Sequence, residues 1–475
     1  MTNQDLAFMP ATAALAAFRR KALSPVELMR AVIARAEATA TSVNALTYTY
    51  FDEALEAAKA AEDRYVRGEP RGVLDGLPVG IKDESYIEGL PTSNGSLVLA
   101  GQVAGHTSVV NQRILAEGGI VHARTATPEF SCSGVTWSRL WGVTRNPWSG
   151  AFTPGGSSGG AAASLASGSS SLATGSDIGG SIRIPASQCG VVGYKPPYGR
   201  NPDEPPFNLD FFNHTGPLAR SVRDTILLQN VMCGPDASDI AALRPKLVLP
   251  DAYAPIAGMR IALSMTLGSF EVDKEVEANT HAAANVLRSL GAIVEEVDIG
   301  WGMEVQEACM AYLTHLFGGA ISNVLAAHAD ELTSYALHFG ETSLSSSAQS
   351  FVGALDTVAR MYHTLGPILD RHDALICPTV SSPTVAAEHD QSRDRVIVNG
   401  KEVAPTLGWV MTTPFNAMSR CPVLSVPTGR VAAGVPTGMQ IVGRTYCDAD
   451  VFRIGLAYET AVGGWYGAPD RRPAT

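Results

Sequence analysis

The chain has 475 residues, of which 45% are hydrophobic, and its 35 basic and 46 acidic residues give a formal net charge of −11. A chain this long and apolar can bury a large core. The acidic balance excludes a nucleic-acid partner for the chain alone, because the sequence has no basic run and no zinc-finger or helix-turn-helix spacing. The ten histidines and seven cysteines form no ligand cluster of metal type, so we expect no metal and no cofactor.

The compartment is inferred from the N-terminus and the cysteines. Leu6 to Phe18 is alanine-rich and broken by Pro10, and the basic pair Arg19-Arg20 follows it, so we expect no export signal. No uninterrupted apolar run of 18 residues occurs, so we expect no membrane span. An odd number of cysteines without a Cys-x-x-Cys pair is typical of a reducing compartment. The sequence therefore predicts a cytoplasmic protein.

Helix and strand signals alternate along the first part of the chain. Ser24-Pro25-Val26-Glu27 combines an N-cap serine, a proline at the first position and a capping-box glutamate, which predicts a helix start. The apolar run Leu77 to Ile81 predicts a strand that ends at Lys82. The other elements expected here are a helix over 52–65, a helix over 108–117 and a strand over 120–123.

The same alternation returns after a glycine-rich core at about 75–225. It predicts strands over 259–263, 292–297, 423–426 and 438–442, and helices over 273–290 and 449–460. Between them, 302–371 reads as mainly helical with a serine-rich break at 343–347, and we expect it to shape the substrate site. The fold class that follows is α/β, one domain over 1–475 with a mostly parallel mixed sheet and helices on both faces.

The segment Thr153 to Pro185 contains two Gly-Gly-Ser turns, which end at Ser157 and Ser181. Glycine lets backbone approach a ligand closely, and each serine hydroxyl can act as a nucleophile or a proton relay. A flexible linker is excluded because helix-forming and core-type residues run through the segment. A phosphate loop is excluded because no Gly-Lys-Ser/Thr follows the glycines.

These turns resemble the signature of the amidase signature family, through Gly156-Ser157-Ser158-Gly159-Gly160 and Gly175 to Ala186. The similarity extends to Gly76-Leu77-Pro78-Val79-Gly80-Ile81-Lys82-Asp83 and, near the end of the chain, to Gly438 to Gly443. The resemblance implies a Ser-Ser-Lys triad with Ser181 as nucleophile, Ser157 as bridging serine behind a cis peptide bond, and Lys82 as base. It also implies an oxyanion hole formed by the backbone of Ile178, Gly179, Gly180 and Ser181.

General chemistry supports such a triad independently of the family resemblance. A serine needs a base as it attacks a carbonyl, and lysine is a base only when burial has lowered its pKa. Strand alternation points Lys82 and Asp83 to opposite faces, so Asp83 would not hold the lysine in its charged form. Asp177 and Arg183 bracket the nucleophile turn, and we interpret both as structural.

Substrate-facing residues are less well defined by the sequence. The loop from Pro205 to His214 and the helical region after Gly302 supply aromatic candidates, including Trp301 and Phe317. The predicted pocket residues are Cys132, Gly134, Phe207, Phe211, His214 and His315.

The function expected is hydrolysis of small neutral amides, anilides or carbamates (urethanes) through an acyl-enzyme, and a homodimer is compatible with the sequence. Three alternatives stay open. The first is the glutaminase A subunit of the tRNA-dependent amidotransferase, although Asn201-Pro202-Asp203-Glu204 differs from its usual serine-rich and basic continuation. The second is a non-catalytic binding protein of the same fold. The third is a cysteine nucleophile such as Cys132.

Overall fold

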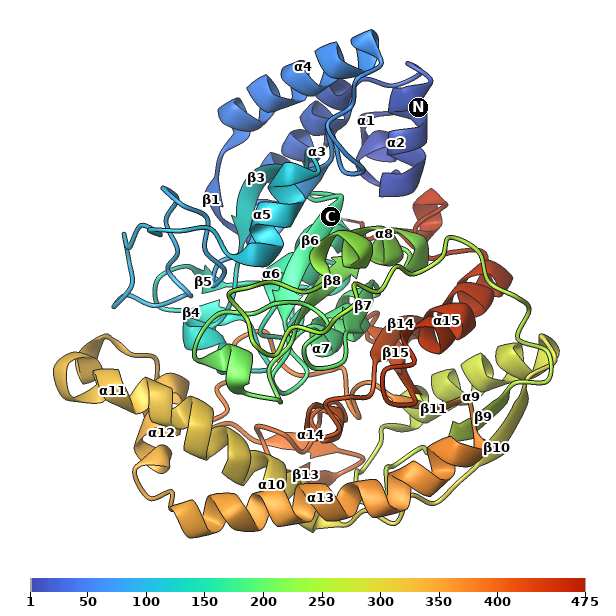
Figure 1. Ribbon diagram of the computed structural model, residues 1–475. Helices are drawn as coiled ribbons and strands as arrows, with labels where there is room; N and C mark the ends of the chain where they lie inside the picture. Colours follow the sequence, from blue (N-terminus) through green and yellow to red (C-terminus); the bar gives the residue numbers. More distant parts are fainter. Residues whose placement is uncertain (1, 475) are drawn as a thin grey trace.

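A long mixed β-sheet runs through the computed structural model, which describes residues 2–474 (Figure 1). Across the sheet its strands lie in the order β1 (Leu46–Thr49), β3 (Ile120–Thr125), β2 (Pro78–Lys82), β6 (Leu172–Ser176), β8 (Thr215–Ala219), β7 (Val192–Lys195), β14 (Val423–Arg430), β15 (Pro436–Gly443), β11 (Ala374–Pro378), β9 (Arg260–Leu263) and β10 (Ile293–Glu296). Two small hairpins lie outside it, formed by β4 (Trp137–Ser138) with β5 (Gly142–Val143) and by β12 (Val396–Val398) with β13 (Lys401–Val403).

The helices follow the α/β order expected from the sequence. They are α1 (Asn3–Ala7), α2 (Ala11–Arg19), α3 (Pro25–Thr39), α4 (Phe51–Arg67), α5 (Val109–Ala116), α6 (Gly159–Ser167), α7 (Arg183–Cys189), α8 (Val222–Met232), α9 (Lys274–Ser289), α10 (Met303–Leu313), α11 (Gly319–His328), α12 (Ser334–Ser343), α13 (Ala348–Arg371), α14 (Pro414–Ala417) and α15 (Asp448–Val462). The predicted helix start at Ser24 is confirmed, because Ser24 and Glu27 form a reciprocal capping box. The predicted serine-rich break is also confirmed, since α12 ends at Ser343 and Ser347 caps α13.

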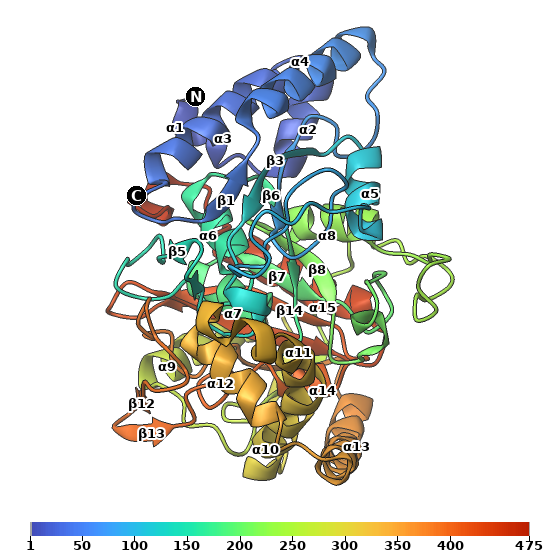
Figure 2. The same cartoon turned by 90° about the vertical axis from the view of Figure 1, so that its left-hand side faces the viewer.

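Helices cover both faces of the sheet, as expected. α6 and α7 pack on one face, and α8, α9 and α15 pack on the other. Helices α1 to α4 lie at one end of the molecule and α10 to α13 at the opposite end, as Figures 1 and 2 show from two directions. The α/β fold class is therefore confirmed.

The predicted predominance of parallel strands is wrong for the centre of the sheet. Parallel pairing joins β3, β2 and β6 at one end and β11, β9 and β10 at the other. Every neighbouring pair from β6 to β11 is antiparallel, and so is β1 on β3. The reason is the connections: β14 and β15 form a hairpin, and β7 reaches β8 through a loop instead of a crossover helix.

The helical region after Gly302 contains an apolar run from Met303 to Glu331, whose best window has a mean hydropathy of 1.2 and is 39% buried within the protein. Its length and composition alone match a membrane helix, and core helices share both properties. Here α10 packs along α13 through buried residues that include Cys309 and Tyr312. We therefore do not assign this run as a membrane-spanning helix.

Candidate active site

The two Gly-Gly-Ser turns meet at one place in the fold. β6 ends at Ser176, the second turn follows, and α7 begins at Arg183, while the first turn leads into α6. The Ser158 N–H donates to the carbonyl oxygen of Ser181 at 3.0 Å, which ties the turns together. The Gly156–Ser157 peptide bond is cis. Gly180 has a φ of +129°, and a Cβ there would collide with Thr412, so only glycine fits.

Lys82 lies at the end of β2 with 1% of its surface exposed. Its Nζ donates to the Oγ of Ser157 at 2.7 Å and to the Oγ of Ser176 at 2.8 Å. Burial lowers the pKa of Lys82, and this effect outweighs the nearby carboxylates, which act in the opposite direction. A buried lysine bonded to a serine hydroxyl is an arrangement suited to moving a proton.

The carboxylates beside Lys82 are arranged only partly as the sequence predicts. Asp83 points away from the lysine, as expected, and accepts hydrogen bonds from the backbone and hydroxyl of Ser93. Glu84 takes the position beside Lys82 instead, with its Oε2 3.1 Å from Nζ. β2 ends at Lys82 and Glu84 lies in the turn that follows, so strand alternation does not predict its position.

Ser181 has 7% of its surface exposed, and its turn presents free backbone donors. Within residues 2–474, the N–H groups of Ile178, Gly179, Gly180 and Ser181 donate to no protein acceptor. The Gly179 carbonyl is held from behind by the hydroxyls of Thr412 and Thr413, each at 2.7 Å. A row of unpaired N–H groups beside a nucleophile can stabilise an oxyanion.

A buried ion pair braces the same turn. The guanidinium of Arg183 binds both carboxylate oxygens of Asp177, at 2.9 and 2.8 Å, and also reaches Gln440 and Asn416. Burial acts to raise the pKa of Asp177, but the charge and hydrogen bonds of Arg183 lower it to about 2. The pair is fully buried and bonded on all sides, which fits a structural role.

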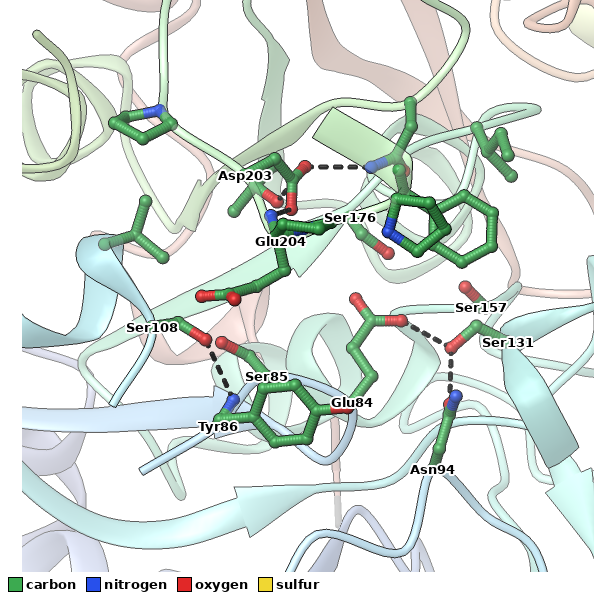
Figure 3. Close-up of a pocket in the computed structure, with 18 of the residues that line it drawn as sticks. Glu84, Ser85, Tyr86, Asn94, Ser108, Ser131, Ser157, Ser176, Asp203 and Glu204 are labelled. Atoms are coloured by element: carbon green, nitrogen blue, oxygen red, sulfur yellow. Dashed lines mark hydrogen bonds between the residues drawn. The ribbon is translucent and has the colours of Figure 1, made fainter. Parts of the chain in front are cut away.

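Two cavities open beside the serines. The first, the Glu84 cavity, has a volume of about 280 Å³ and a lining that is polar and apolar in similar parts; it includes Glu84, Ser131, Ser157, Ser176, Asp203, Glu204 and Phe207 (Figure 3). The second, the Ser181 cavity, has a volume of about 50 Å³ and is mainly apolar; it is lined by Cys132, Gly134, Ser181, Ile184, Met310, Leu313, Phe317, Phe339, Leu407 and Val410, among others. Ser131, Ile178 and Phe317 line both.

The predicted pocket residues divide into two groups. Cys132 and Gly134 line the Ser181 cavity, and Phe207 lines the Glu84 cavity. Burial raises the pKa of the Cys132 thiol well above its usual range, which disfavours a cysteine nucleophile.

Phe211, His214 and His315 line neither cavity, and their assignment as pocket residues stays a prediction. Phe211 packs against Phe212 and Tyr312 and faces an outer groove instead. His214 is buried behind the turn that holds Ser181, where a ring nitrogen lies 3.2 Å from the Asp177 carbonyl. His315 stacks on Phe351 and binds the Ser346 hydroxyl at 2.8 Å.

Several residues at the site were missed by sequence reasoning. The main ones around the Glu84 cavity are Glu84, Ser131, Ser176, Asp203 and Glu204. Those around the Ser181 cavity are Met310, Leu313, Phe339, Leu407 and Val410. Among residues 2–474, no group of three or more His, Cys, Asp or Glu side chains is placed to hold a metal ion.

Comparison with known proteins agrees with this geometry. The Amidase family profile matches residues 27–452. The chain is 32% identical over 483 residues to an acylamidase of Rhodococcus erythropolis, an alignment that covers 100% of this chain and 99% of that protein. It is equally 32% identical, over 505 residues and 99% of both chains, to the A subunit of the glutamyl-tRNA(Gln) amidotransferase of Chloroflexus aggregans (strain MD-66 / DSM 9485). A bacterial aryl acylamidase structure superposes with a TM-score of 0.88 at 31% identity, over 96% of each chain.

The fold and these matches define a hydrolase that acts on carbon–nitrogen bonds. The chain belongs to the amidase signature family, as the two Gly-Gly-Ser turns predicted.

Proposed function

We propose that this protein is a serine amidohydrolase that cleaves small neutral amides and anilides through an acyl-enzyme formed on Ser181. The observation that carries the proposal is the contact of a fully buried lysine with a serine hydroxyl, Lys82 Nζ to Ser157 Oγ at 2.7 Å, next to the turn that holds Ser181. The free N–H groups from Ile178 to Ser181 support the same role, because acyl transfer needs donors for the developing oxyanion.

In this mechanism the Ser181 Oγ forms a bond to the carbonyl carbon and gives its proton to Ser157. Ser157 in turn gives its own proton to the neutral amine of Lys82, which becomes an ammonium. When the C–N bond breaks, the same proton path runs in reverse and protonates the leaving nitrogen. Water then attacks the acyl-enzyme with the relay acting again as base, which releases the acid and restores Ser181.

The two cavities suggest how the substrate lies. The apolar Ser181 cavity fits the acyl group, since Ser181 and Gly179 form part of its wall beside Met310, Leu313 and Phe339. The Glu84 cavity, whose lining is mixed, includes Ser157, which protonates the leaving group in this mechanism, so it fits the amine portion. This division favours an apolar or aryl acyl group. The proposal extends to simple aryl carbamates, whose carbonyl carbon is attacked in the same way.

The test is to trap the nucleophile and measure turnover. Purified protein is treated with a fluorophosphonate, the adduct is mapped by mass spectrometry, and acetanilide, benzamide and an aryl carbamate are assayed. We expect an adduct on Ser181, none in S181A, and hydrolysis of at least one substrate. An adduct elsewhere, or no turnover of any of the three, contradicts the proposal.

The glutaminase A subunit is the second candidate, because the chain is as similar to the amidotransferase protein as it is to the acylamidase. A protein of that kind releases ammonia from glutamine in company with partner proteins. Ammonia release from glutamine that appears only when those partners are added would favour this candidate. Hydrolysis of anilides by the isolated chain would favour the first.

We further propose that the protein works in the cytoplasm; a homodimer stays an expectation that is compatible with the sequence. All seven cysteines are free, which supports a reducing compartment. Fractionation of cells and light scattering of the purified protein test these two points.

A further inference from the structure

Glu84 connects the substrate cavity to the buried lysine. Its Oε2 lies 3.1 Å from Lys82 Nζ, and the Ser131 hydroxyl donates to the same oxygen at 2.6 Å. The Glu84 side chain is 20% exposed, whereas that of Lys82 is 1% exposed. Figure 3 shows the carboxylate reaching into the cavity toward Ser131. A charge in this position can change the basicity of Lys82 without itself accepting the proton.

The number of hydrogen bonds at Lys82 Nζ gives Glu84 a geometric role. An ammonium has three donors, and here they meet Ser157, Ser176 and Glu84. A neutral amine has two N–H groups and one lone pair. When the two N–H groups are held by Ser176 and Glu84, the lone pair is left facing the Ser157 hydroxyl, which is the orientation that proton transfer needs.

We propose that Glu84 is a positioning residue of the proton relay, which aims the lone pair of Lys82 at Ser157 and sets the pH at which the relay works. This inference rests on the proposed function. The Glu84 carboxylate favours the ammonium form of Lys82, so it moves the onset of activity to higher pH. The same charge stabilises the ammonium that forms when Ser181 attacks, so it speeds acylation once Lys82 is neutral.

Other charged groups surround the pair and are kept constant in the test. Asp177, beyond β6, also favours the charged form of Lys82. Arg124 on β3 donates to the Lys82 carbonyl at 3.1 Å and interacts with the charge of Glu84. Asp203 lies across the cavity, and burial raises its pKa to about 7. Glu204 pairs with His106, and Tyr86 borders both glutamates.

The experiment measures the rate of Ser181 labelling by a fluorophosphonate from pH 5 to pH 10, in the unsubstituted protein and in the E84Q variant. The Gln side chain keeps the shape of Glu and loses its charge. We expect the acidic limb of the E84Q profile to move down by about one pH unit or more. We also expect its rate at high pH to fall by about tenfold, so that the two profiles cross. E84D, which keeps the charge, should return the limb toward its original position.

E204Q is the matched control, since it removes a carboxylate from the same cavity without touching Lys82. Its acidic limb should move by less than about a third of a pH unit, because charges farther from Lys82 are screened more strongly. A profile of E84Q that is lowered equally at every pH, with no movement of the limb, would overturn the inference. Failure of the probe to label Ser181 in the original protein would instead overturn the proposed function.

Discussion

At the scale of single residues, Lys82 and Ser176 test the relay. Lys82→Ala removes the base and should lower anilide hydrolysis by about 10²–10⁴-fold. Ser176→Ala removes only one of the three contacts at Nζ and should cost about tenfold, the upper value of one ordinary hydrogen bond. Steady-state rates of purified variants measure both. Because Ser176 holds the lysine without accepting its proton, equal losses in the two variants would contradict this division of roles.

Phe317 separates the two cavities, and its removal should change substrate preference. The residue lies in a π-helical turn, Thr314–Gly318, and contacts Phe207 edge-on across the Glu84 cavity. Phe317→Ala should join the cavities and raise kcat/KM for a bulky acyl anilide relative to acetanilide by about tenfold. Phe351→Ala is the control, because Phe351 packs behind the turn against His315 and lines neither cavity. A similar change in both variants would show that loosened packing is the cause.

What the sequence could predict at this scale depends on how local each signal is. Lys82, Ser157 and the turn that holds Ser181 lie in short local motifs, and the resemblance of those motifs to the amidase signature family implies their roles. Glu84 and Ser131 have no such motif, because they become neighbours only when the turn after β2 and the turn at 129–131 fold against each other. His214 and His315 were chosen for their chemistry, and the fold uses each for packing and hydrogen bonds instead.

At the scale of elements, the turn between β6 and α7 depends on Arg183. Its guanidinium makes hydrogen bonds to Asp177, Gln440, Asn416 and the Thr412 carbonyl, with no exposed surface. Arg183→Lys keeps the charge but loses the planar, forked set of N–H donors that the guanidinium provides. It should therefore lower the free energy of unfolding by about 2–4 kcal/mol. It should also reduce activity by about tenfold or more. The N–H groups proposed to bind the oxyanion belong to this turn, so a change in its shape displaces them.

Denaturant unfolding and anilide hydrolysis measure the two effects of Arg183→Lys. Arg360→Lys is the control, since Arg360 forms an exposed pair with Asp356 on α13, and such pairs contribute little. Retention of full activity by Arg183→Lys would show that the turn holds its shape without the fork.

The strands and helices themselves were predicted well where their signals are local, as at the capping box of α3 and the break before α13. Strand direction was not predicted correctly at the centre of the sheet. Whether β7 runs with or against β8 depends on the path of the loop between them, and that loop carries no periodic signal.

At the scale of the whole molecule, buried carboxylates join distant segments to helix starts. Asp224 on α8 accepts hydrogen bonds from the backbone of Ala11 and Thr12 at the start of α2. Glu459 on α15 accepts from the Val222 N–H at the start of α8, at 3.1 and 3.2 Å. Carboxyl groups at helix N-termini satisfy free N–H groups, and an ionised one also interacts favourably with the helix dipole. Helices near the two ends of the chain, α2 and α15, are thus connected through α8.

Glu459 makes the stability of this connection depend on pH. Burial raises its pKa to about 8, against an ordinary value of 4.5. Because the folded-state pKa is the higher one, its contribution to stability is fully present below about pH 4.5 and is lost as the pH rises toward 8. Glu459→Gln keeps an oxygen for Val222 and cannot ionise. Its thermal midpoint should therefore match that of the original protein at pH 5 and exceed it by about 2–4 °C at pH 8.5.

Differential scanning fluorimetry at the two pH values measures the effect. Glu307→Gln, on the exposed surface of α10 and outside its first turn, serves as control and should leave both midpoints unchanged. The decisive quantity is the difference between the two pH values, since a repacking effect of Gln would appear equally at both. A midpoint increase of the same size at pH 5 and pH 8.5 would mean that Gln acts through packing alone, and that ionisation of Glu459 does not weaken the connection between α15 and α8.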